Sequence, residues 1–252
     1  EISPDAIMVH GDTTTAFCAA LAGFYLRIPV VHVEAGLRTH DVSSPFPEEL
    51  NRQAIARIAQ LNFSPTSLAA SNLEAEGIPK ERICITGNTV VDSSVWLSEN
   101  YLQNSEWLAN QAEMFSHMGL PDILGKRFCL VTLHRRENQG SGFRDVLNVI
   151  RIKAKENPGF SFIFPVHPNP NISGLAREIL GGLVNVYLIP PLDYLNFSLL
   201  LAYSSLIISD SGGVQEEAVT FGKKVLIARE ATERPEGLNT GFMELVGGNS
   251  EL

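Results

Sequence analysis

The sequence contains few cysteines, few basic residues and no long apolar run. Its three cysteines, Cys18, Cys84 and Cys129, are odd in number and widely spaced, which argues against a disulfide framework or a zinc site and favours a reducing cytosol. No apolar run approaches the roughly 20 residues of a membrane-spanning helix, so we expect a soluble, cytoplasmic protein without a membrane partner. The 28 acidic residues outnumber 19 basic ones, and no basic block offsets them, which argues against a nucleic-acid partner.

Several nucleotide-binding and metal-binding motifs are also absent. The sequence contains neither G-x-x-x-x-G-K-[ST] nor G-x-G-x-x-G, and no spacing of His, Cys and Asp fits a familiar metal site. These absences weaken the interpretations as an ATPase or a dinucleotide-binding enzyme. We therefore expect no cofactor and no metal, and an anionic ligand would need a local binding site.

Short apolar runs alternate with helical patterns along the chain. This order predicts parallel sheets with right-handed crossovers, hence an α/β fold of two Rossmann-like, doubly wound domains. A long polar stretch from about Val90 to Lys126 contains helical segments but no convincing strand, so we place the boundary there, between domains 1–90 and 91–252. The predicted strands are 6–10, 30–34, 61–64, 82–86, 128–133, 160–166, 184–189, 206–208, 224–227 and 242–246.

Carboxylates follow the first two predicted strands, at the edge where such sheets bind ligands. Asp12, Glu34 and Glu48 form a possible group that could exchange protons with a sugar, since converging carboxylates raise one another's pKa. The alternative makes Asp12 a helix cap and Glu48 a first-turn residue that complements its helix dipole. Glu34 has no evident capping role.

The stretch from Leu206 to Ala218 predicts a buried strand, a tight turn and the start of a helix. Gly212 and Gly213 would let backbone amides at the helix N-terminus approach a diphosphate, and Glu217 could accept hydrogen bonds from ribose hydroxyls. The alternative is a strand–helix turn that uses glycines for geometry alone.

Three further positions follow predicted strands. His134 precedes two arginines and could hold phosphate or assist proton transfer, or lie in a solvated loop. Arg234 could contact an anion or a hydroxyl, or be a simple surface charge. His167 lies in a proline-rich turn, where a structural role is favoured.

Ten short segments carry a recognisable pattern along essentially the whole chain: His10–Thr13, His32–Thr39, Pro47–Glu49, Asn51–Arg52, Thr86–Thr89, His134–Asn138, Pro165–His167, Ser209–Gly213, Gln215–Glu217 and Thr232–Glu236. In this order they closely resemble the non-hydrolysing UDP-N-acetylglucosamine 2-epimerases.

The resemblance implies a glycosyltransferase-B fold with UDP-sugar in a cleft between two Rossmann-like halves. It also implies interconversion of UDP-N-acetylglucosamine and UDP-N-acetylmannosamine through C2 deprotonation, loss of UDP to leave 2-acetamidoglucal, and re-addition, without nicotinamide or metal. A homodimer is implied for the full-length protein. The carboxylates Asp12, Glu34 and Glu48 match acid–base positions of the family, and His134 matches its active-site histidine. The positions that match contacts to UDP are Phe197 near the uracil, Ser211, Gly212, Gly213, Glu217 and Arg234.

The chain departs from the family at both ends. It opens at Glu1–Asp5, directly before the first strand, whereas family members carry earlier elements with a basic segment, and they continue beyond Leu252. We therefore expect a fragment whose first domain is marginal on its own, because its sheet would expose a parallel edge. The alternatives are a glycosyltransferase of the same fold, the hydrolysing relatives and a UDP-sugar-binding fragment without activity. The group of three carboxylates favours the epimerase.

Overall fold

A computed structural model of the chain describes residues 3–133, 141–229 and 232–247. It divides into two compact units, Glu1–Thr89 and Val90–Leu252. Each unit contains one parallel sheet, which confirms the predicted α/β class. None of the helices in the described ranges combines the length and apolar character that spanning a bilayer requires.

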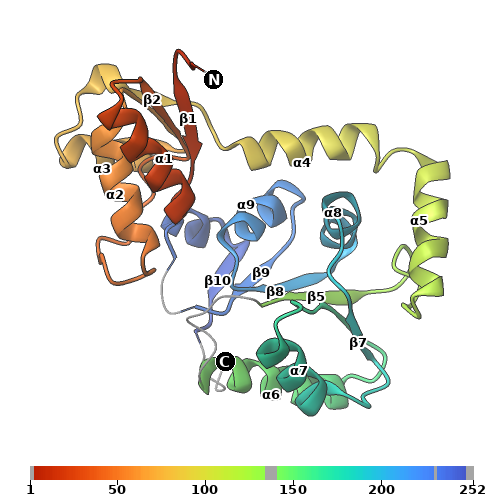
Figure 1. The fold of residues 1–252 in the computed structure, drawn as a ribbon. Coiled ribbons are helices and arrows are strands. Elements are labelled where there is room, and N and C mark those ends of the chain that lie inside the picture. Colours follow the sequence, from red (N-terminus) through yellow and green to blue (C-terminus); the bar gives the residue numbers. More distant parts are fainter. Residues whose placement is uncertain (1–2, 134–140, 230–231, 248–252) are drawn as a thin grey trace. The chain divides into compact units, whose positions relative to one another are not determined.

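The first unit contains a four-stranded parallel sheet in the order β1-β2-β3-β4. Figure 1 labels β1 and β2 and the helices α1, α2 and α3 of this unit. Two of its helices begin at threonines whose hydroxyls accept from the first turn: Thr13 from the Ala16 amide at 3.2 Å, and Thr66 from the Ala69 amide at 3.1 Å. The elements are β1 (Ile7–His10), α1 (Thr14–Tyr25), β2 (Val30–Val33), α2 (Glu48–Ile58), β3 (Leu61–Ser64), α3 (Ser67–Ala75), η1 (Lys80–Arg82) and β4 (Ile83–Ile85).

The second unit contains a six-stranded parallel sheet in the order β10-β9-β8-β5-β6-β7. The order reverses at β5, which pairs with β6 on one side and β8 on the other, so the carboxyl ends of β5 and β8 flank the point where doubly wound sheets bind ligands. The elements are α4 (Thr89–Asn100), α5 (Ser105–His117), β5 (Phe128–Thr132), α6 (Ser141–Glu156), β6 (Ser161–Pro165), α7 (Pro170–Leu180), β7 (Val186–Ile189), α8 (Tyr194–Tyr203), β8 (Leu206–Ser209), α9 (Gly212–Thr220), β9 (Val225–Ile227), η3 (Pro235–Thr240) and β10 (Met243–Leu245).

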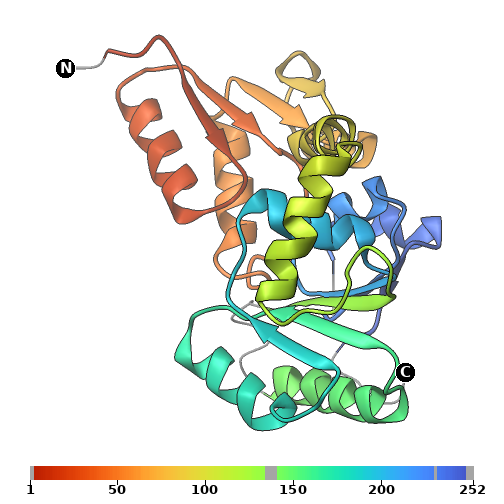
Figure 2. The same ribbon diagram turned by 90° about the vertical axis from the view of Figure 1, so that its right-hand side faces the viewer.

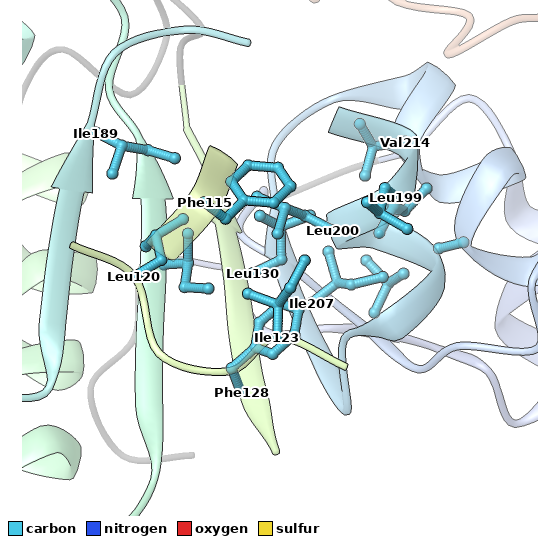
Figure 3. Close-up of a cluster of buried hydrophobic side chains, with 14 of the residues drawn as sticks. Phe115, Leu120, Ile123, Phe128, Leu130, Ile189, Leu199, Leu200, Ile207 and Val214 are labelled. Atoms are coloured by element: carbon cyan, nitrogen blue, oxygen red, sulfur yellow. The ribbon is translucent and has the colours of Figure 1, made fainter. Parts of the chain in front are cut away.

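Helices cover both faces of this second sheet, with α8 and α9 on one face and α6 and α7 on the other (Figures 1 and 2). The core on the α8 face is built from large side chains, and Phe115 of α5 lies among them (Figure 3). Its buried members include Phe115, Phe128, Leu130, Leu199, Leu200 and Ile207. A second cluster with Leu147, Ile150 and Phe164 lies under α6 and α7.

Most elements lie within a few residues of their predicted bounds. The strand β3 begins and ends at the predicted residues, and the polar stretch after Val90 forms α4 and α5 without a strand. The short helix η3 was not predicted, because Pro235–Thr240 has turn chemistry rather than helical periodicity. The cysteines are free, and Cys18 and Cys84 are exposed.

Candidate functional site

The carboxyl ends of β1 and β2 bring two of the predicted carboxylates together. His10, the last residue of β1, pairs with Val33, the last residue of β2, so Asp12 and Glu34 follow neighbouring strands at one edge of the sheet. The alternative role of Asp12 as a helix cap is wrong, because Thr13 caps α1 and the Asp12 carboxylate pairs with Arg52.

Arg52 of α2 joins these two residues. Its Nη2 contacts the Asp12 Oδ2, and its Nη1 donates to the Glu34 carbonyl at 3.1 Å and lies 3.9 Å from the Glu34 Oε2. The guanidinium is buried, whereas the two carboxylates keep 21% and 16% of their side-chain surface. A cation between two carboxylates offsets their mutual repulsion and fixes their separation. Asn51, the preceding residue, donates to the Asp12 carbonyl at 2.9 Å.

Glu34 has a left-handed backbone conformation with φ of 64°. This conformation costs an ordinary residue about 1–2 kcal/mol, and such strain is concentrated at functional positions. The Glu34 carboxylate accepts from the Asn88 side-chain amide at 3.2 Å and lies 4.0 Å from the His10 Nε2. The turn therefore directs the carboxylate toward a set of polar partners.

Glu48 is the first residue of α2 and precedes Arg52 by four residues, so both lie on one face of that helix. Within the described residues its carboxylate makes no hydrogen bond or ion pair, and the structure does not join it to Asp12 or Glu34. Its neighbour Glu49 is the structural residue, since it is buried and accepts from the Thr39 amide at 3.1 Å.

The second unit places the predicted diphosphate contacts at the start of α9. Ser211 is the N-cap and gives the helix no side-chain cap, and Gly212 and Gly213 are its first two residues. The first-turn amides of such a helix carry partial positive charge and bind anions. Ser211 lies two residues beyond the end of β8, at the edge where the strand order reverses.

Arg234 packs directly over this helix N-terminus. A Cβ built on Gly212 would collide with the Arg234 guanidinium, so the glycine permits the close approach. The guanidinium Nε contacts the Glu216 Oε1, and Nη1 lies 3.7 Å from the Glu233 Oε2. Glu233 is held in turn by Arg229 at 2.9 Å. Arg234 is thus buried and positioned by two carboxylates, which the surface-charge alternative does not describe.

Glu217 lies one turn further into α9 and is only 7% exposed. Burial, together with the neighbouring Glu216 carboxylate, raises the pKa of Glu217 to about 7. Near neutral pH this group therefore exists in both protonation states: the ionised form accepts hydrogen bonds through both oxygens, whereas the protonated form also carries a donor and is the weaker acceptor.

Phe197 of α8 lines a small cavity of about 170 Å³ at the carboxyl ends of β5, β6 and β7. The strand-end argument misses this residue, because it comes from a helix. His167 lines the same cavity and accepts from the Asn169 amide at 3.2 Å, so its imidazole both holds its turn and faces the cavity. The other lining residues are Thr132, Leu133, Pro165, Pro191 and Leu192.

His134 lies outside the described residues. In the described ranges no group of three or more His, Cys, Asp or Glu side chains is arranged to hold a metal ion. Arg52, Asn51 and Asn88 were not predicted as site residues. Their contacts join residues that lie 18 to 54 positions apart in the sequence. The sequence pointed to them only because they belong to segments that resemble the epimerase family.

Two parallel sheets, one with two carboxylates held by an arginine at its strand ends and the other with a helix N-terminus beneath a buried arginine, define an α/β protein of two Rossmann-like units. A family profile described as UDP-N-acetylglucosamine 2-epimerase matches residues 1–252. The chain is 46% identical to a UDP-N-acetylglucosamine 2-epimerase of Yersinia pestis over 249 residues, which are 99% of this chain and 65% of that protein.

The chain is also similar in structure to solved UDP-GlcNAc 2-epimerases. The Neisseria meningitidis UDP-GlcNAc 2-epimerase bound to UDP-GlcNAc has a TM-score of 0.93 and 43% identity, with 98% of this chain and 66% of that one covered. The Methanocaldococcus jannaschii enzyme in complex with UDP-GlcNAc and UDP has a TM-score of 0.85 and 34% identity over the same shares. The chain belongs to the UDP-N-acetylglucosamine 2-epimerase family, and it spans about 65% of the length of these relatives.

Proposed function

We propose that the protein interconverts UDP-N-acetylglucosamine and UDP-N-acetylmannosamine. The observation that carries this proposal is the pair of carboxylates, Asp12 and Glu34, held around the buried Arg52 in a chain of this family. Glycosyl transfer or simple binding gives no obvious reason for two fixed carboxylates at one strand edge, whereas inversion at a carbon needs proton removal and proton return.

In the proposed reaction one carboxylate removes the C2 proton of the sugar while the C1–O bond to UDP breaks, which leaves 2-acetamidoglucal. UDP then adds back to C1, and C2 receives a proton on the opposite face. A C2–H next to an acetal carbon is weakly acidic, so the step needs a positioned base and stabilisation of the departing diphosphate. Asp12, Glu34 and Glu48 are the proposed acid–base residues, with His134 as a further proposed contributor.

The second unit supplies the proposed UDP contacts. The amides of Gly212 and Gly213 and the Arg234 guanidinium would stabilise the diphosphate as it leaves, with Ser211 beside them. Glu217 would accept from the ribose hydroxyls, and Phe197 would contact the uracil from the cavity that it lines. Two of the solved relatives carry UDP-GlcNAc, which supports this assignment.

Neither a nicotinamide nor a metal ion takes part in the proposed reaction, so EDTA should leave the rate unchanged. A homodimer is part of the same proposal, and light scattering would measure the mass of the particle. The proposed partners are UDP-N-acetylglucosamine and UDP.

Proton NMR of UDP-N-acetylglucosamine incubated with the protein in D2O tests the reaction. Deuterium at C2 together with the manno isomer would support the proposal. UDP binding without exchange at C2 would contradict it and leave a binding protein. Loss of UDP-sugar only when an acceptor is present would indicate a glycosyltransferase.

A further inference from the structure

His32 is fully buried in the middle of β2, between β1 and β3. Its Nε2 lies 2.8 Å from the Gly11 carbonyl oxygen. Because a carbonyl oxygen only accepts, the Nε2 must carry the hydrogen. Burial, with Arg52 and Arg38 nearby, lowers the pKa of His32 to about 4, so the ring is neutral at physiological pH and Nδ1 carries no hydrogen.

The Gly11 carbonyl belongs to the peptide plane that leads directly into Asp12. Gly11 has a φ of 69°, and its amide donates to the Val33 carbonyl at 3.0 Å. Since the peptide unit is planar, a hydrogen bond to its oxygen also fixes the Asp12 nitrogen and Cα. On the other side, Asn51 holds the Asp12 carbonyl and Arg52 contacts its carboxylate.

We propose that His32 is a positioning residue for Asp12: its Nε2–H fixes the Gly11 carbonyl and thereby the direction in which the Asp12 side chain leaves the loop. This inference rests on the proposed function in one respect, because it is Asp12 that acts on the substrate there. The competing explanation is that the imidazole only satisfies a buried carbonyl and contributes to stability.

Two substitutions separate these explanations. His32→Leu removes the donor, and His32→Gln supplies an amide nitrogen that can reach the place of Nε2. We expect His32→Leu to lower kcat for epimerisation at least tenfold, with KM and the Kd for UDP changed less than twofold, and His32→Gln to restore part of kcat. Equal kcat in the two variants would overturn the proposal.

Val30→Ala is the matched control. Val30 is also buried, two positions before His32 on the same face of β2, but its apolar side chain makes no hydrogen bond, so the variant leaves the Gly11 carbonyl held by His32. We expect this variant to lose thermal stability and to keep its kcat within twofold. A loss of kcat as large as that of His32→Leu would mean that any damage to this part of the core suffices, which contradicts the proposal.

A double-mutant cycle with Asp12 distinguishes a positioning role of His32 from a purely structural one. In an Asp12→Asn background, His32→Leu should lower the remaining rate less than twofold, since the residue that it positions is already disabled. The same fold-loss in both backgrounds would overturn the proposal.

The His32 hydrogen bond can be tested without measuring activity, so this inference and the proposed epimerase function can fail separately. Long-range proton–nitrogen spectra of protein with 15N-labelled histidine should show the His32 ring as the neutral Nε2–H tautomer from pH 6 to 8. A protonated ring or an Nδ1–H tautomer would overturn this inference. A wild-type protein that binds UDP but shows no C2 exchange would instead overturn the proposed function, and the spectra would still decide the hydrogen bond.

Discussion

Glu217 changes its charge around neutral pH, because burial and the neighbouring Glu216 carboxylate raise its pKa to about 7. Ribose hydroxyls donate to the ionised carboxylate, so UDP should bind the ionised form. Below pH 7 the group is protonated, and we expect the Kd for UDP to be about tenfold higher at pH 6 than at pH 8. Calorimetry at a series of pH values measures this dependence.

The matched variant is Glu217→Gln, which cannot ionise. It should bind UDP more weakly at pH 8 and lose most of the pH dependence, leaving only that of the UDP phosphate. Because the folded pKa lies above the unfolded value of 4.5, the carboxyl destabilises the fold progressively as pH rises from 4.5 to 7. The variant should therefore melt no lower than wild type at pH 8. An unchanged pH profile of the Kd would assign the titration to another group.

Arg52 is the buried cation that contacts both Asp12 and Glu34 in the first unit. Arg52→Gln would remove the cation that the Asp12 and Glu34 carboxylates share. We expect kcat to fall at least a hundredfold, the stability to fall by about 3 kcal/mol, and the Kd for UDP to stay within twofold, because the proposed UDP contacts lie in the second unit. Steady-state kinetics and urea unfolding measure these effects.

Arg52→Lys is the informative comparison for this prediction. A lysine keeps the charge but places it on a single nitrogen, whereas Arg52 bonds to the Asp12 carboxylate and the Glu34 carbonyl through two separate nitrogens, so the kcat of Arg52→Lys should lie between those of wild type and Arg52→Gln. If Arg52→Lys were fully active, charge alone would suffice, and the double contact would have no role in the reaction.

At the scale of the element, the start of α9 depends on one glycine more than on the other. A Cβ at Gly212 would meet the Arg234 guanidinium, whereas a Cβ at Gly213 meets nothing within 4 Å. Gly212→Ala should therefore displace the guanidinium and raise the Kd for UDP about tenfold, a loss of roughly 1.4 kcal/mol. Gly213→Ala should raise the Kd for UDP clearly less, since the backbone amide of residue 213 stays in place. Similar Kd values for the two variants would contradict a close approach of Arg234.

The elements were predictable because their signals are local, whereas the contacts within the site are not. The short segment Leu61–Ser64 predicted β3, and Gly212–Gly213 after a buried strand indicated the start of α9. The site joins Arg52 to Asp12 across 40 positions and Asn88 to Glu34 across 54, and no periodicity encodes such pairs. The left-handed backbone conformation of Glu34 could not be predicted either, because glutamate, unlike glycine or asparagine, rarely adopts it.

At the scale of the whole molecule, the two units differ in the size of their buried side chains. The first unit buries mostly small residues, with Ile55 and Leu73 as its largest fully buried side chains, and it leaves Met8 and Tyr25 at 67% and 75% exposure. The second unit buries several phenylalanines and many leucines. Because stabilisation grows with the apolar area that is buried, the first unit should be the less stable of the two.

Hydrogen exchange read out by mass spectrometry tests this difference. Peptides from β1 to β4 should exchange through a lower-energy opening than peptides from β5, β6 and β8. UDP at a hundred times its Kd should protect the second unit by about 2.7 kcal/mol and leave the first unit unchanged, because every proposed UDP contact among the described residues lies beyond residue 196. Uniform exchange that UDP slows equally in both units would mean that the chain unfolds as one cooperative body. The second unit would then stabilise the small core of the first, and UDP bound to the second unit would also stabilise the region of the first unit that contains Asp12 and Glu34.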